Sequence, residues 1–149
     1  MLLANNGEYV RPTGIDKIYF NDELIYENQK VDKNIYNEGT AYLLTDMLKG
    51  VLSERWGTGY GLSLKNKMPS AAKTGTTDDN KDGWFAGYTP YYTTTIWVGN
   101  DSPSTVNGLY GGTYPGRIWK NYMDKIHEGL PVEDFVMPEG TKKMYVNLS

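Results

Sequence analysis

The sequence predicts an α+β fold: an antiparallel sheet of three strands, a separate β-hairpin and packed helices, all within one unit spanning residues 1–149. Two patterns predict it. Apolar residues after Thr40 recur at the three- and four-residue spacing of an amphipathic helix. After Ala71, short runs of β-branched and aromatic residues alternate with turn residues, as strands do. With 149 residues and 39% hydrophobic content, the chain suits a soluble domain with a core of its own.

The composition excludes several classes of function. The net charge of −3 does not favour nucleic-acid binding, which needs a basic patch or stripe. The sequence has no Cys and one His, His127, which leaves little for a disulfide framework, a zinc site or a Ser-His-Asp triad. Its apolar runs are too short to span a membrane. We therefore expect no cofactor, no metal, no nucleic acid and no membrane segment in this chain.

The first third of the sequence predicts a helix end and a hairpin. Residues 1–7 are apolar and then close on Asn-Asn-Gly, a helix stop, so the chain is expected to open on the last turn of a helix. Residues 15–26 place apolar runs on either side of Asn21-Asp22, which indicates a β-hairpin. The polar stretch 27–37 is interpreted as a connection.

Two amphipathic helices are predicted. The first begins near Thr40 and ends at residues 56–59, and an exposed loop is expected over 57–69. The second has Pro115 at a first helical position and ends near Gly129. At the end of this helix we expect His127 to complement the helix dipole as a cation, with no catalytic or metal role. The tail, 130–149, has no clear periodicity.

Three strands are predicted between these helices, at 71–77, 84–89 and 93–99. The second and third are joined through Pro90 as a hairpin, whereas 100–113 is rich in Gly, Ser and Asn. We expect the large aromatic residues Trp84, Phe85 and Trp97 to pack on the sheet rather than to bind a substrate.

The motif with the most chemistry is the strand segment Lys73-Thr74-Gly75-Thr76-Thr77. Strand alternation puts Lys73, Gly75 and Thr77 on one face and Thr74 and Thr76 on the other, so a site that uses both sets lies along the strand edge. A cation, hydroxyl donors and a Gly that admits a second backbone form an anion-binding element. Such an edge also accepts an extended peptide by β-addition.

This segment is followed by Lys81-Asp82-Gly83-Trp84-Phe85-Ala86-Gly87-Tyr88-Thr89-Pro90 and by Thr94-Thr95-Ile96-Trp97-Val98-Gly99. Together with Ala4-Asn5-Asn6-Gly7, the run from Ala41 to Val51, and Ile118-Trp119-Lys120, these residues closely resemble the C-terminal part of the transpeptidase domain of class A penicillin-binding proteins. Lys-Thr-Gly belongs to the signature of these enzymes, with Ser-x-x-Lys and Ser-x-Asn.

The resemblance implies a D,D-transpeptidase that cross-links peptidoglycan stem peptides through an active-site Ser and is acylated by β-lactams. It implies that Lys73 is catalytic, by raising the positive potential and helping proton transfer. Thr74, Gly75, Thr76 and Thr77 would bind substrate: Thr74 and Thr76 hold the terminal carboxylate, and the Thr76 N–H is one of two oxyanion donors, each worth about 2.7–4 kcal/mol. The parent proteins are membrane-anchored, at the extracytoplasmic face of the bacterial cytoplasmic membrane, and also carry a glycosyltransferase domain.

The nucleophile is not found in its expected place. The formal match Ser70-Ala71-Ala72-Lys73 is rejected, because strand residues three apart point to opposite faces. Ala72 also replaces the Gly that the family usually has before the Lys. We therefore expect residues 1–149 to be the C-terminal portion of the domain, without the nucleophile and inactive alone.

An unpaired sheet edge leads us to expect self-association, since the family sheet has five strands and only three are predicted here. Two other functions stay open. A non-catalytic cell-wall-binding module would stack glycan on Tyr91, Tyr92 and Trp97. A serine β-lactamase shares Lys-Thr-Gly but would need a deacylating carboxylate that is not identified. The acidic residues Asp78, Asp79 and Asp82 are expected to form a solvated turn rather than a calcium loop.

Overall fold

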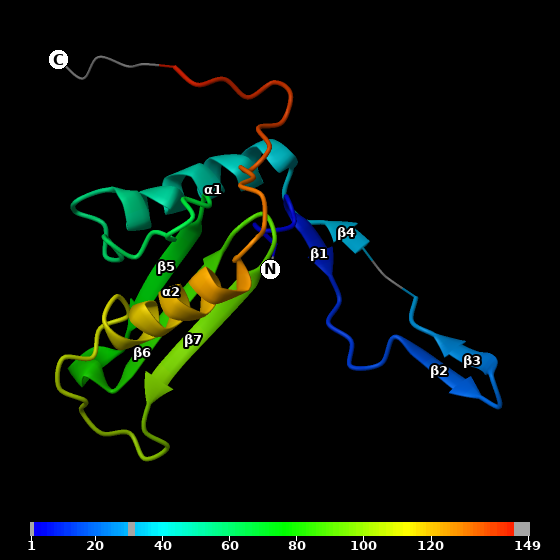
Figure 1. Ribbon diagram of the computed structural model, residues 1–149, viewed down its shortest axis with the longest axis horizontal. Helices are drawn as coiled ribbons and strands as arrows, with labels where there is room; N and C mark the ends of the chain where they lie inside the picture. Colours follow the sequence, from blue (N-terminus) through cyan, green and yellow to red (C-terminus); the bar gives the residue numbers. More distant parts are fainter. Residues whose placement is uncertain (1, 30–31, 145–149) are drawn as a thin grey trace.

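The computed structural model describes residues 2–29 and 32–144, and in these ranges it has three antiparallel sheets and two α-helices (Figure 1). The main sheet contains β5 (Ala71–Thr76), β6 (Asp82–Tyr88) and β7 (Thr93–Gly99) in the order β5-β6-β7. The predicted α+β class and the three predicted strands are confirmed. Within the described residues, β5 and β7 are the two edges of this sheet.

The register of the main sheet sorts its side chains between two faces. Thr74 pairs with Phe85, and Phe85 with Ile96, so these three lie on one face. Phe85 is fully buried there, as expected. Trp84 and Trp97 pair with each other on the opposite face, where their rings lie 6.2 Å apart and both are nearly half exposed. They pack on the sheet, as predicted, but not in the core.

Helix α2 (Tyr114–Ile126) covers the Phe85 face of the sheet, and Pro115 lies in its first turn as predicted. Trp119 at its centre is fully buried, packs against Phe85 with the ring centroids 5.1 Å apart and the rings tilted by 46°, and donates from Nε1 to the Gly87 carbonyl at 3.3 Å. A Cβ at Gly87 would lie 2.6 Å from the Trp119 ring. The absence of a side chain at Gly87 is therefore what lets α2 lie this close to β6.

Helix α1 (Glu38–Ser53) packs mainly against β5. It begins two residues before the predicted Thr40 because Asn37 caps it, with Oδ1 accepting from the Thr40 N–H at 2.7 Å. On the sheet side, the buried hydroxyls of Thr45 and Tyr88 are hydrogen-bonded at 2.9 Å. Burial raises the pKa of the Tyr88 phenol, and this hydrogen bond opposes the rise.

The segment 57–69 is not the exposed loop that the sequence predicts. Leu62, Leu64 and Met68 are buried in the core, alternating with exposed residues. The segment is fastened to α2 at two points: the Lys65 N–H donates to Asp124, and Lys120 donates to the Ser63 carbonyl. The prediction was wrong because three apolar residues at irregular spacing have no periodic signal, although tertiary packing buries them. The core cluster comprises Leu52, Leu62, Leu64, Met68, Ala72, Phe85, Trp119 and Met123.

The predicted hairpin is confirmed as β2 (Lys17–Phe20) and β3 (Glu23–Glu27), an arm that projects away from the main sheet (Figure 1). Asn21 and Asp22 have positive φ of 47° and 64°, the conformation of a two-residue type I′ turn. An ion pair of 2.8 Å joins Lys17 to Glu27 across the strands.

At the base of the arm, β1 (Glu8–Val10) pairs with β4 (Asp32–Asn34), so part of the predicted connection 27–37 is a strand. Its sequence, Asp-Lys-Asn, has low β-propensity, and only pairing with a distant segment makes it extended. The helix stop predicted near the N-terminus agrees with the bonding there. The Gly7 N–H donates to Leu2 O and the Asn6 N–H to Leu3 O, the pattern of a Schellman motif. Met1, residues 30–31 and the end of the tail, residues 145–149, lie outside the described residues.

None of the helices over 2–29 and 32–144 has the length and apolar character needed to cross a membrane. The tail after α2 runs back over the molecule as irregular chain, where Phe135 meets Tyr88 edge-to-face at 5.6 Å.

The contact of Trp119 with the sheet predicts a large effect of its removal. We expect Trp119→Ala to lower the free energy of unfolding by about 3–5 kcal/mol, because the cavity would open between α2 and β6. Urea denaturation followed by circular dichroism measures it. Trp56→Ala is the matched control: Trp56 is 81% exposed, so its removal should cost less than about 0.5 kcal/mol. Equal losses in both variants would contradict this account of the core.

Candidate substrate-binding strand

Strand β5 brings the predicted site residues together along one edge of the main sheet. Lys73 and Thr76 are exposed, whereas Thr74 and Gly75 are half-buried. In the described part of the chain, β5 pairs only with β6, so no strand occupies its outer edge, although α1 packs against the same strand. Ala71 and Ala72 at the start of the strand are buried, and the Ala72 side chain belongs to the core cluster. The extra methyl at position 72 therefore fills the core.

Lys73 presents an uncompensated positive charge at this edge. Its Nζ donates to the backbone carbonyl of Thr74 at 2.8 Å. Among residues 2–29 and 32–144 it forms no ion pair with a carboxylate. The remaining ammonium donors are free to attract an anion.

The Thr74 hydroxyl is held by Thr58, at an Oγ1–Oγ1 distance of 2.7 Å. One of the two hydroxyls donates to the other, so when Thr58 donates, the Thr74 hydrogen is free for a ligand. Sequence reasoning missed Thr58, which follows α1 by five residues. The sequence feature that could have pointed to Thr58 is its position between Gly57 and Gly59. The chain folds back there, and the Gly59 N–H donates to Val51 O at 3.0 Å.

The Thr76 hydroxyl is held from the other side by the loop that leads into α2. The Gly111 N–H donates to Thr76 Oγ1 at 3.1 Å, which leaves the hydroxyl hydrogen free to donate outward. Gly111 lies so close to the sheet that a Cβ there would be 2.5 Å from the Trp84 carbonyl and 2.9 Å from the Gly75 backbone. Gly111 was also missed, because nothing in the periodicity of 100–113 points to β5.

Thr77 lies just beyond the end of β5, with its hydroxyl occupied. Thr77 Oγ1 accepts from the Asp82 N–H at 2.8 Å and lies 3.2 Å from the Asp82 carboxylate, which closes the turn between β5 and β6. Asp78–Asn80 form a short 3-10 turn there, and Lys81 pairs with Asp79 at 3.3 Å. No group of three or more potential metal ligands exists within the described ranges.

Ser70 is not arranged as a nucleophile with Lys73. Its hydroxyl is nearly buried and donates to the Met68 carbonyl at 2.9 Å, while Lys73 is bonded to Thr74. The geometry agrees with the rejection of Ser70-Ala71-Ala72-Lys73 as a catalytic motif.

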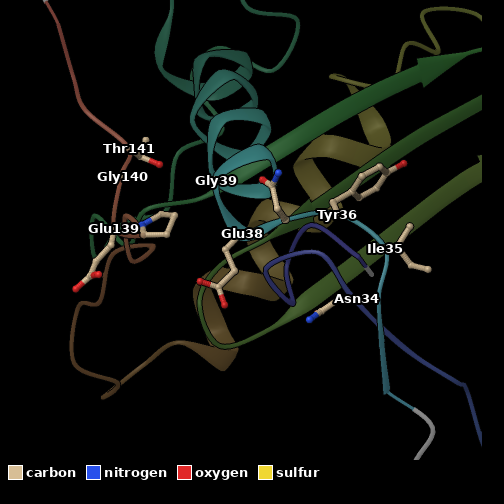
Figure 2. A pocket seen from close by; sticks show the side chains of 10 residues that line it. Asn34, Ile35, Tyr36, Glu38, Gly39, Glu139, Gly140 and Thr141 are labelled. Carbon is tan, nitrogen blue, oxygen red and sulfur yellow. The ribbon is translucent and has the colours of Figure 1, made fainter.

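Two of the hollows in the described part of the chain lie beside α1, and they differ in character. An apolar hollow of about 340 Å³ adjoins Lys73 and is lined by side chains of α1, β6 and the N-terminal turn, including Leu2, Leu44 and Tyr88. A wider one of about 870 Å³ lies at the start of α1, between residues 34–39 and 138–141 (Figure 2). Its charged lining residues are Glu38 and Glu139, so it does not suit a carboxylate ligand.

The sequence model described as "Penicillin binding protein transpeptidase domain" matches residues 1–124. The chain belongs to this transpeptidase family. Among curated relatives, it is 36% identical over 138 residues to penicillin-binding protein 1A of Clostridium botulinum, covering 92% of this chain and 16% of the relative. It is 38% identical over 116 residues to penicillin-binding protein 1A of Pseudomonas aeruginosa, covering 77% of this chain and 14% of the relative. The chain thus spans about a sixth of the length of these relatives.

Solved structures show the same fold. The crystal structure of penicillin-binding protein 1A from Haemophilus influenzae superposes with a TM-score of 0.79 at 20% identity, over 93% of this chain and 26% of that one. An imipenem acyl-enzyme complex of penicillin-binding protein A from M. tuberculosis superposes with a TM-score of 0.55 at 18% identity, over 80% of this chain and 28% of that one.

A non-catalytic cell-wall-binding module would need Tyr91, Tyr92 and Trp97 on one glycan-binding surface. These three aromatic residues do not lie together in the structure. Trp97, in β7, lies five residues beyond Tyr92, which directly precedes this strand, or roughly 17 Å at strand rise. It contacts Trp84 and donates from Nε1 to Asp82 at 2.9 Å. Tyr91 and Tyr92 instead pack against the ring of His127.

His127 is at the C-terminal end of α2, as predicted, and its ring is buried. Nδ1 lies 2.7 Å from the Met123 carbonyl, so it carries the hydrogen, and Nε2 lies 2.9 Å from the Thr89 hydroxyl. The ring ties the end of α2 to the turn between β6 and β7.

Because Gly111 lies so close to the backbone of β5, we predict that a methyl group at this position disturbs the strand. We expect Gly111→Ala to lower the free energy of unfolding by about 1–3 kcal/mol and to shift the Thr76 amide signal, because the loop has to lift off the sheet. Thermal unfolding and 15N NMR spectra measure both. Gly14→Ala is the control, since a Cβ at Gly14 has open space. An unshifted Thr76 signal in Gly111→Ala would contradict the proposed support of Thr76.

Proposed function

We propose that this chain carries the substrate-recognition strand of a peptidoglycan D,D-transpeptidase, and that the stem peptide and β-lactams both bind along β5. The observation that carries the proposal is the free edge of β5, where the Lys73 ammonium lies beside two hydroxyls that are each held in place by a second element. The parent protein is an enzyme of the penicillin-binding family.

The arrangement suits the C-terminal carboxylate of a peptide. Lys73 supplies the positive charge, and hydrogen bonds to a charged carboxylate are the stronger kind. Thr58 and Gly111 orient the hydroxyls of Thr74 and Thr76, so a ligand would not have to immobilise them. They are positioning residues in this proposal.

A peptide that adds to β5 would form main-chain hydrogen bonds with the strand and enter antiparallel or parallel to it. Gly75 is the fifth of the six residues of β5, and its missing Cβ lets a second backbone approach. The Thr76 N–H is proposed as one oxyanion donor, as the family resemblance implies. The Thr77 hydroxyl, which is bonded to Asp82, has a role in the turn, so its predicted contact with substrate is the least supported of the set.

Residues 1–149 are proposed to be inactive by themselves. Nucleophilic catalysis needs a serine beside a base. In the described part of the chain, no serine hydroxyl is hydrogen-bonded to a lysine or histidine side chain; Ser53, Ser63 and Ser70 all donate to backbone carbonyls. The parent protein is proposed to act at the extracytoplasmic face of the bacterial membrane, to which it is anchored, as the family resemblance implies.

Binding of a peptide carboxylate to β5 can be measured by NMR. We expect a peptide ending in D-Ala-D-Ala to shift the amide signals of residues 73–76 with millimolar affinity. Lys73→Ala and Thr76→Val should weaken binding roughly tenfold or more, because each removes a charge-assisted contact worth about 1.5–3 kcal/mol. Thr76→Ser keeps the hydroxyl and should bind normally. Thr93→Val, on the opposite edge strand, is the second control. Shifts confined to other parts of the chain would refute the site.

Acylation provides a separate measurement. We expect no covalent labelling of the 149-residue chain by fluorescent penicillin after denaturing electrophoresis, while a complete penicillin-binding protein in the same gel is labelled. Stoichiometric labelling of the chain would show that it contains its own nucleophile. Ser70→Ala, if it abolished such labelling, would identify the residue.

A further inference from the structure

Two segments that are far apart in the sequence touch each other beside β5. Residues 57–59 follow α1, and residues 110–113 lead into α2. A Cβ at Gly112 would overlap the carbonyl oxygen of Thr58. The φ of Gly112 lies outside the left-handed region, so its backbone conformation is open to any residue. The close contact with Thr58 is therefore what requires a glycine at this position.

This contact closes a ring around the hydroxyls of the candidate site. The Thr58 hydroxyl lies 2.7 Å from that of Thr74, at one position of β5. The Gly111 N–H donates to the Thr76 hydroxyl at 3.1 Å, two positions further along the strand. Gly112 follows Gly111 and rests on Thr58, so the supports of the two hydroxyls are joined to each other.

The Thr58 side of the ring is anchored to the end of α1. The Gly59 N–H donates to the Val51 carbonyl at 3.0 Å, and the Gly57 N–H donates to the Glu54 carbonyl at 2.8 Å. A Cβ at Gly57 would overlap the Val51 carbonyl oxygen, so this turn is already packed against the helix. Thr58 consequently has little room to move away from β5.

The other side of the ring is anchored to α2. The Tyr110 N–H donates to Thr113 Oγ1 at 2.9 Å, and the Gly116 N–H, in the first turn of α2, donates to the Gly111 carbonyl at 3.0 Å. Trp119 holds the helix on the sheet. Both sides of the ring are thus fixed, and a displacement at their contact has to pass into the hydrogen bonds at β5.

We propose that Gly112 is a positioning residue that couples the two hydroxyls, so that Thr74 and Thr76 are oriented together. A methyl group at position 112 pushes against the Thr58 carbonyl, and well-packed contacts do not absorb an added methyl group without shifts of the backbone. The shift reaches Thr74 through the Thr58 hydroxyl and reaches Thr76 through the Gly111 N–H. The ring exists in the free chain, so only its effect on a ligand rests on the proposed function.

The coupling has a consequence for a peptide carboxylate bound at β5. A hydroxyl that is oriented before binding costs a ligand less than one that has to be ordered on binding, by about 0.5–1.5 kcal/mol for a side chain. We therefore expect Gly112→Ala to weaken binding of a peptide ending in D-Ala-D-Ala roughly two- to tenfold.

Amide 15N NMR spectra of the free 149-residue chain test the coupling without a ligand. We expect Gly112→Ala to shift the signals of Thr74 and Thr76 together. Gly39→Ala is the matched control, because a Cβ there meets its nearest neighbours at 3.5 Å, an ordinary contact. In a Thr58→Val background, which lacks the hydroxyl, Gly112→Ala should shift Thr74 markedly less, whereas Thr58→Ser should keep the full effect.

Each outcome decides the proposal. If Gly112→Ala moves Gly111 and Thr76 but not Thr74, or moves Thr74 equally with and without the Thr58 hydroxyl, the coupling is refuted. Circular dichroism shows whether the variants are folded. Thr58→Val alone replaces an exposed side chain by one of the same shape, and unchanged Gly111 and Thr76 signals in that variant would also refute the coupling.

The same samples separate this proposal from the proposed function. A native chain that binds no peptide ending in D-Ala-D-Ala, while the expected shifts occur in the free variants, would refute the proposed ligand and support the coupling. Peptide binding that is equally strong in the native chain and in Gly112→Ala, with Thr74 unshifted, would support the ligand and refute the coupling.

Discussion

The structure depends on the close approach of α2 to the main sheet. Trp119 fills the space over β6, packs against Phe85 and donates to the Gly87 carbonyl, and the missing side chain at Gly87 makes this approach possible. Residues 100–113, which connect β7 to α2, then cross the sheet. That path brings Gly111 onto β5, where its N–H holds the Thr76 hydroxyl. A packing contact in the core thereby fixes a hydrogen bond at the candidate site.

The two edges of the main sheet have different properties, although both are free in the described chain. The β5 edge has a positive charge and hydroxyls that neighbouring segments hold in place, which suits a small anionic peptide end. The β7 edge is uncharged and lies beside the exposed apolar residues Ile118 and Tyr122 of α2. Membership in the penicillin-binding transpeptidase family supports the function proposed for the first edge.

Particular elements show how far sequence reasoning reaches. The hairpin at Asn21-Asp22 was predictable because a turn of this geometry needs residues that tolerate positive φ, and the flanking apolar runs are local. Strand β4 was not predictable, since Asp-Lys-Asn becomes extended only by pairing with β1, more than twenty positions earlier. Likewise, Leu62, Leu64 and Met68 enter the core without any periodic pattern, because the space they fill is formed by α1, α2 and the sheet together.

By itself, the sequence determined the family, the fold class and the strand that bears Lys73, Thr74 and Thr76, because these follow from local patterns and from a motif of adjacent residues. The tertiary structure decided which groups support them. Thr58 and Gly111 are 16 and 35 positions away from the hydroxyls they hold. It also decided that His127 is buried and that Trp84 and Trp97 are half exposed. The physical reason is common to all of these: contacts between distant segments depend on how elements pack, and packing has no signature in any single stretch of sequence.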